Sequence, residues 1–218
     1  MKALVVGATG LIGKECVLQL LQNSNYDEVI VWVRKSIGYS HAKLNEQIID
    51  FSNIETIQIS GINHIFCCLG TTIKKAKNIE AYHKIDVDYV VQLAQLAEKN
   101  KVQKFVVISS LGANKTSSNY YLKMKGEMEE AVSKCNIPSI IILRPSMLLG
   151  KRQEFRMGEL IGKAVMKTIG FVFIGKLKKY AGIKSSDVVK TMICLANQNN
   201  SGVLVYESDQ IKNIAKGH

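Results

Sequence analysis

The feature that most constrains this chain is a glycine-spaced turn near its start. The apolar run 3–6 is followed by Gly7, Gly10 and Gly13, and then by apolar residues at helical spacing. Glycines spaced in this way let the backbone turn sharply and let a ligand approach, while the unpaired N–H groups of a new helix favour an anion. The pattern predicts a strand, a phosphate-sized loop and a helix, which suits a dinucleotide pyrophosphate. Because the spacing is G-x-x-G-x-x-G and not the usual G-x-G-x-x-G, an ordinary strand-to-helix turn is the alternative.

Strand-like and helix-like segments alternate along the rest of the chain. The apolar patterns predict strands at 28–33, 47–51, 62–69, 105–108 and 139–143, and helices at 11–21, 78–100, 121–135 and from 187 onward. Such alternation builds a parallel sheet with helices on both faces. No linker-like stretch divides the chain. We therefore expect an α/β fold, a Rossmann-like doubly wound parallel sheet, in a single domain over residues 1–218.

The residues after the second predicted strand are placed to read an adenosine ribose. An acidic residue there would accept from the 2′-hydroxyl of NAD, but this chain has Arg34 and Lys35. A guanidinium can bind a phosphate through two parallel hydrogen bonds. Arg34 therefore predicts NADP(H) as cofactor, and a solvated arginine at a strand end is the alternative.

Another glycine follows the predicted strand 62–69. Ligands of open α/β sheets lie outside the carboxyl ends of the strands, so Leu69 and Gly70 are candidate contacts on the adenine and ribose side. Cys67 and Cys68 are expected to pack as small buried hydrophobes. His83 and Asp86, near the start of the next predicted helix, have no nucleophile in phase and are expected on the helix surface.

Ser110, Tyr121 and Lys125 form the candidate catalytic group. Tyr121 and Lys125 are four residues apart on a predicted helix, so they occupy neighbouring positions of one face. The ammonium favours the phenolate by its charge and can bond a nicotinamide ribose, so the tyrosine can transfer a proton at a carbonyl oxygen. A serine from the preceding strand end can hold that oxygen, with Ser109 as the alternative to Ser110. The same spacing occurs without a Ser-Ser strand end at Tyr39/Lys43 and Tyr180/Lys184.

Charge and cysteine content bear on partners and compartment. The formal net charge of +11 comes from lysines spread along the chain, which favours a solvated basic face and suits a polyanionic cofactor. Nucleic acid is a weaker interpretation, because aromatic residues do not interleave with the basic ones. The five cysteines include no C-x-x-C pair, so we expect no metal site and a cytoplasmic location. No apolar run is long enough to span a bilayer, so no membrane partner is expected, and an oligomer is left open.

In combination, these motifs resemble an atypical short-chain dehydrogenase/reductase. More closely, three stretches resemble the Tat-interacting oxidoreductase-like family: FCCLGTT at 66–72, YLKMKGE at 121–127 and RPSMLLGKRQE at 144–154. The resemblance extends to about Arg156. It implies that Tyr121 transfers the proton and that NADPH contacts Thr9, Gly10, Leu11, Ile12, Arg34, Lys35, Leu69, Gly70, Tyr121, Lys125, Leu148 and Arg156.

The resemblance implies an NADPH-dependent oxidoreductase with a small-molecule carbonyl or alcohol substrate. The alternative is an NADP(H)-binding redox sensor or regulatory protein with little turnover, because family members are discussed in that role. A complete Ser/Tyr/Lys set favours the enzyme, since a sensor has no need of a tuned proton donor.

The alternating pattern breaks at 152–184. This segment follows the strand that ends before Arg144, so we expect it to overhang the nicotinamide end of the crevice. It is predicted to form the substrate-side wall and a lid, with Arg156 holding its near end to the cofactor. A static helix packed on the core is the alternative.

Overall fold

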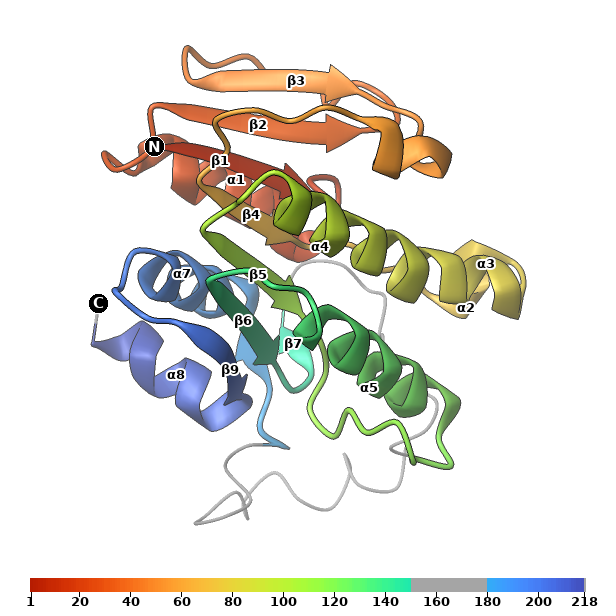
Figure 1. The fold of residues 1–218 in the computed structure, drawn as a ribbon. Helices are drawn as coiled ribbons and strands as arrows, with labels where there is room; N and C mark the ends of the chain where they lie inside the picture. The colour runs from red at the N-terminus through yellow and green to blue at the C-terminus, as the bar shows by residue number, and fades with distance from the viewer. Residues whose placement is uncertain (150–179, 218) are drawn as a thin grey trace.

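The computed structural model describes residues 1–149 and 180–217. In this part of the chain, seven parallel strands form one sheet in the order β3-β2-β1-β4-β5-β6-β9, and helices lie on both of its faces (Figure 1). The expected doubly wound α/β fold is therefore confirmed. The strands are β1 (Lys2–Val6), β2 (Glu28–Val33), β3 (Leu44–Ile48), β4 (His64–Cys67), β5 (Lys104–Ile108), β6 (Ser139–Arg144) and β9 (Gly202–Glu207). The helices are α1 (Leu11–Gln22), α2 (Ile73–Ala76), α3 (Ile79–His83), α4 (Tyr89–Lys99), α5 (Tyr120–Ser133), α7 (Ser185–Ala196) and α8 (Ser208–Lys216).

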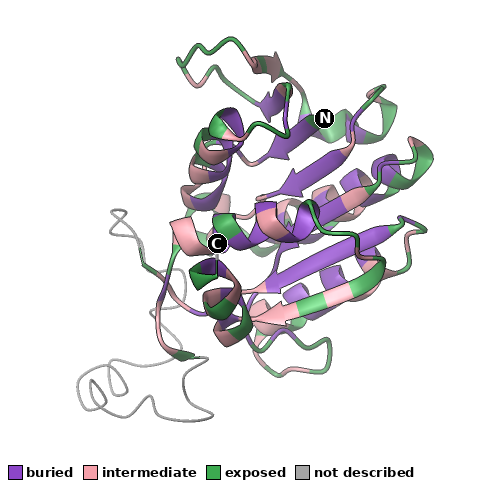
Figure 2. Cartoon of the chain, turned by 90° about the vertical axis from the view of Figure 1, so that its left-hand side faces the viewer, coloured by how far each residue is buried: buried purple, intermediate pink, exposed green. Residues whose placement is uncertain are grey.

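The central strands are apolar throughout because both of their faces are covered. In β1, Ala3 and Val5 pack on the side of α1 and α7, while Leu4 and Val6 pack on the side of α4 and α5. All four side chains are fully buried. Figure 2 shows the buried strands lying between the two helical layers. The runs of apolar residues therefore predicted the inner strands well.

The edge strand β3 lies earlier in the chain than the predicted strand 47–51. It spans Leu44–Ile48, and its residues are exposed or half-buried, so it has no continuous apolar run. Phe51 instead begins a short 3₁₀ helix, η1 (Phe51–Thr56), and its ring packs against Tyr89 of α4 with the ring centres 5.9 Å apart. Phe51, the apolar residue that suggested a strand, thus packs against a helix instead.

The second half of the described chain differs from expectation in two places. The helix predicted at 78–100 consists of α3, a π-helical turn η2 (Lys84–Asp88) and α4. The elements β9 and α8 were not predicted, although β9 contains the apolar run 203–206. Most of the predicted wall and lid at 152–184 lies outside the described residues. Its described end forms β8 (Ile183–Lys184), which pairs in parallel with β7 (Leu148–Leu149).

A buried polar group joins elements at the amino ends of the strands. The Tyr26 hydroxyl lies 2.8 Å from Nδ1 of His64, and Asn197 donates to the same hydroxyl at 3.1 Å. Burial, with a smaller effect of Lys104, lowers the pKa of His64 to about 4. This neutral imidazole therefore helps to hold β4 to the turn after α1 and to the end of α7.

The depressed pKa of His64 predicts a pH-dependent stability. His64 titrates at 6.5 when exposed and at about 4 in the fold, so the unfolded chain binds more protons between these pH values. The free energy of unfolding should fall as pH drops through this window, with about 3 kcal/mol lost from this group by pH 4. Urea unfolding of His64→Gln at pH 7 and pH 4 should lack that part of the loss. The exposed histidine variant His41→Gln should keep it, and equal losses in His64→Gln and wild type would contradict the assignment.

Candidate active site

A cavity of about 1030 Å³ lies where the carboxyl ends of β1, β2, β4 and β5 meet. The predicted site residues that line it are Gly7, Thr9, Gly10, Leu11, Ile12, Arg34, Lys35, Leu69, Gly70, Ser110, Tyr121, Lys125 and Leu148. Gly13 is not among the lining residues, because it is buried in α1. Arg156 lies outside the described residues. The structure therefore brings together side chains from six separate stretches of the chain.

The glycine turn is shaped by backbone contacts. Gly7 has φ +90°, and a Cβ built on it would lie 2.5 Å from the Cys68 carbonyl oxygen. A Cβ on Gly13 would collide with the Gly7 carbonyl oxygen. Gly7 and Gly13 are thus required by the fold itself. Gly10 begins α1 without a side-chain cap, so the first-turn N–H groups remain suited to an anion.

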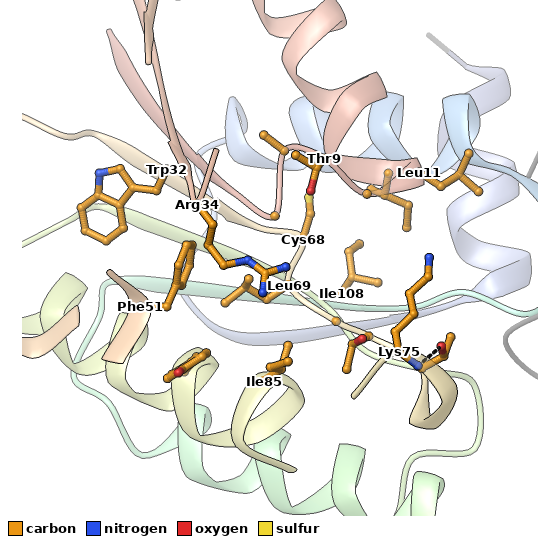
Figure 3. Close-up of a pocket in the computed structure, with 18 of the residues that line it drawn as sticks. Thr9, Leu11, Trp32, Arg34, Phe51, Cys68, Leu69, Lys75, Ile85 and Ile108 are labelled. Atoms are coloured by element: carbon orange, nitrogen blue, oxygen red, sulfur yellow. Dashed lines mark hydrogen bonds between the residues drawn. The ribbon is translucent and has the colours of Figure 1, made fainter. Parts of the chain in front are cut away.

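Arg34 and Lys35 follow β2 at one end of the cavity. Figure 3 shows the Arg34 side chain extending into the cavity, on the side where Trp32 and Phe51 lie. Lys75 extends into it from α2, toward the side where Leu11 lies. Further lining residues that the sequence analysis did not identify are Trp32, Asp50, Phe51, Lys75, Lys84, Ile85 and Tyr89. They belong to no recognised motif and reach the cavity from the end of β2 and through the packing of η1, α2, η2 and α4 around it.

Two pairs of candidate catalytic residues line the cavity. Ser109 and Ser110 directly follow β5, and Tyr121 and Lys125 lie in the first turns of α5. The Asn119 side chain caps α5 by accepting from the Leu122 N–H at 3.1 Å, which fixes the first turn that carries Tyr121. The Ser110 hydroxyl donates to the Leu111 carbonyl over a long 3.5 Å. The Ser109 hydroxyl is buried and has no hydrogen-bond partner among the described residues.

Asp86 is buried behind the cavity, which corrects the expectation that it lies on a helix surface. Its Oδ1 is 2.8 Å from Lys125 Nζ, and the two side chains are only 3% and 5% exposed. Its Oδ2 accepts the Thr71 N–H at 2.7 Å. The available signal was its position four residues before Val90, in phase with the apolar stripe of α4. His83 is half-exposed, and its Nδ1 lies 3.1 Å from Oδ1 of Asp88.

The described residues contain no group of three His, Cys, Asp or Glu side chains that could hold a metal ion. Among the described helices, we find none with the length and apolar character needed to cross a membrane. Cys68 is half-buried and lines the cavity, whereas Cys67 is buried as expected.

Known proteins resemble this chain in sequence and in fold. The family model described as NAD(P)H-binding matches residues 7–167. Protein HTATIP2 of Rattus norvegicus is 32% identical over 73% of this chain and 67% of its own length. The mitochondrial protein FMP52 of Eremothecium gossypii is 29% identical over 99% of this chain and 98% of its own. The oxidoreductase ylbE of Lactococcus lactis, 20% identical, shares the fold with a TM-score of 0.68, covering 100% of this chain and 96% of its own.

These relatives correct one expectation and confirm another. The cytoplasmic location is contradicted, because several similar proteins are named as mitochondrial. The cysteine argument indicates only a reducing environment and does not separate one such compartment from another. The resemblance to Tat-interacting oxidoreductase-like proteins is confirmed by the HTATIP2 match. Because the family model matches more than half of the sequence, the chain belongs to the NAD(P)H-binding family.

Proposed function

We propose that this protein is an NADPH-dependent oxidoreductase that acts on a small carbonyl or alcohol substrate. The observation that carries the proposal is one cavity lined by Arg34, by the uncapped start of α1 and by Tyr121 and Lys125. Groups suited to anions and groups suited to proton transfer thus face the same space. Membership of the NAD(P)H-binding family supports the cofactor class.

Two parts of the cavity would hold the phosphate groups of the cofactor. The backbone N–H groups of the turn at Thr9 and at the start of α1 suit the pyrophosphate. Arg34 and Lys35 suit a 2′-phosphate, because two cations at that position match its charge and a guanidinium its geometry. The remaining proposed contacts are Leu11, Ile12, Leu69, Gly70, Lys125 and Leu148, with Arg156 beyond the described residues.

The residues of α5 and β5 would carry the proton chemistry. NADPH, when bound, supplies a hydride for the carbonyl carbon. The Tyr121 hydroxyl gives its proton to the carbonyl oxygen, which completes the alcohol, and later regains a proton from solvent. Lys125, one turn along α5, stabilises the tyrosinate by its charge. A hydroxyl from Ser110, or from Ser109, donates a hydrogen bond that holds the carbonyl oxygen.

Arg34→Ala tests the choice of cofactor. Loss of a charge-assisted phosphate contact should cost about 1.5–3 kcal/mol of NADPH binding, roughly tenfold or more in Kd, and little of NADH binding. Titration of both dinucleotides by fluorescence measures this. Lys74→Ala is the matched control, because Lys74 is exposed and is not a cavity-lining residue. Equal losses for NADPH and NADH would refute the role of Arg34.

Tyr121→Phe tests the proton donor. It should lower carbonyl reduction by about 100-fold or more and leave NADPH affinity nearly unchanged, because the ring remains and only the proton is lost. Loss of NADPH absorbance with a panel of aldehydes, ketones and quinones reports turnover. Tyr120→Phe is the control, because that neighbouring tyrosine is 42% exposed and does not line the cavity.

Two outcomes of that experiment would overturn the proposal. Full turnover in Tyr121→Phe would show that the Tyr121 hydroxyl is not the proton donor. A wild-type protein that binds NADPH but turns over no member of the panel would favour the NADP(H)-binding regulator.

Single alanine variants separate the two serines. If Ser110 holds the carbonyl oxygen, Ser110→Ala should lower kcat/KM by about tenfold or more, and Ser109→Ala should change it little. The opposite order would assign the role to Ser109, whose hydroxyl has no partner in the described chain.

A further inference from the structure

We propose that Asp86 is a positioning residue that balances part of the charge of Lys125, so that Lys125 stabilises the tyrosinate of Tyr121 less strongly and more of Tyr121 stays protonated. This inference rests on the function proposed above. It adds one residue to that function.

Asp86 and Lys125 form a buried ion pair. Asp86 Oδ1 lies 2.8 Å from Lys125 Nζ, and both side chains are almost fully buried. An isolated charge in such surroundings is costly, so each member depends on the other. Asp86 therefore fixes where the Lys125 ammonium sits on the wall of the cavity.

The other carboxylate oxygen of Asp86 has a separate partner. Its Oδ2 accepts the Thr71 N–H at 2.7 Å, next to Gly70 in the loop after β4. One carboxylate thus serves two donors, one on α5 and one on the loop that lines the proposed cofactor site. An asparagine in the same orientation would turn its amide nitrogen, which is a donor, toward one of these two donors.

The pairing of Lys125 with Asp86 also has an electrostatic effect on Tyr121. An ammonium balanced by a carboxylate at this distance exerts a weaker field on a neighbouring phenol than an unbalanced one. Tyr121 is the neighbour one turn before Lys125 on α5. The balanced pair therefore favours the protonated phenol, which is the form that gives a proton to a carbonyl oxygen.

Among the described residues, the other ionisable groups near the pair do not supply this balance. Cys67 on β4 faces the pair, but burial raises the pKa of its thiol to about 12, so it is neutral. Lys75 on α2 and Lys84 on η2 line the same cavity and add positive charge. Asp50 and Arg34 line it beside η1 and β2. All of these groups stay in place in a variant of Asp86.

Asp86→Asn tests the inference in two ways. Removing the negative charge should move the alkaline limb of the pH profile for carbonyl reduction to lower pH by about one unit or more. In the protein without cofactor, the tyrosine ionisation that disappears in Tyr121→Phe, followed by ultraviolet absorbance, should shift in the same direction. The shift should be absent from the double variant Asp86→Asn/Tyr121→Phe.

Matched variants separate this role from a merely structural one. Asp88→Asn removes a half-exposed carboxylate of the same π turn, paired with His83, and should leave both readouts as in wild type. Asp86→Glu keeps the charge and should restore the wild-type limb. Where Asp86→Asn reduces folding, Asp86→Ser is a smaller neutral variant with the same expected shift.

The outcomes are distinct from those of the proposed function. An unshifted pH limb and an unshifted tyrosine titration in a folded Asp86→Asn protein would overturn the inference. A shifted titration in a protein without any turnover would support the electrostatic role of Asp86 and count against the oxidoreductase function.

Discussion

The position of the candidate site depends on how the chain leaves the sheet on either side of β1. β1 lies between β2 and β4, and the chain passes to β2 and β3 on one side before it returns to β4, β5 and β6 on the other. The turn after β1 leads to α1 on one face, whereas the loop after β4 leads to α4 on the opposite face. The two connections diverge at their carboxyl ends and leave a crevice. Arg34, Ser110 and Tyr121 meet there because all of these strands end at the same edge.

The sequence predicted the parts of the fold that depend on local patterns. Inner strands are covered on both faces, so they appear as unbroken apolar runs, and β2 was predicted at its observed bounds. The edge strand β3 has only partial cover and mixed side chains, so its pattern resembles a loop, whereas β9 was missed although it contains the apolar run 203–206. Phe51 shows the reverse error, because the last apolar residue of a predicted strand packs from a short helix. Local patterns therefore predict burial better than they predict edges.

The candidate site divides in the same way. The glycine turn, the cations after β2 and the tyrosine and lysine of α5 each lie at a strand end or helix start, which the sequence pattern already locates. Asp86 was placed wrongly because its burial depends on Lys125, which belongs to a different helix. The serine remains open for a similar reason. Ser109 and Ser110 are adjacent in sequence, and only the surroundings of each hydroxyl distinguish them.

The close approach of Gly7 to Cys68 has a consequence for the order of folding. The left-handed backbone of Gly7 fits against the backbone after β4, which the chain reaches only after β2 and β3. A nascent chain that ends before β4 carries the whole glycine motif but lacks the surface against which the motif takes its shape. Long-range contacts of this kind form late, since the intervening loop must close first. The glycine turn therefore takes its final shape only once β4 has joined the central strands.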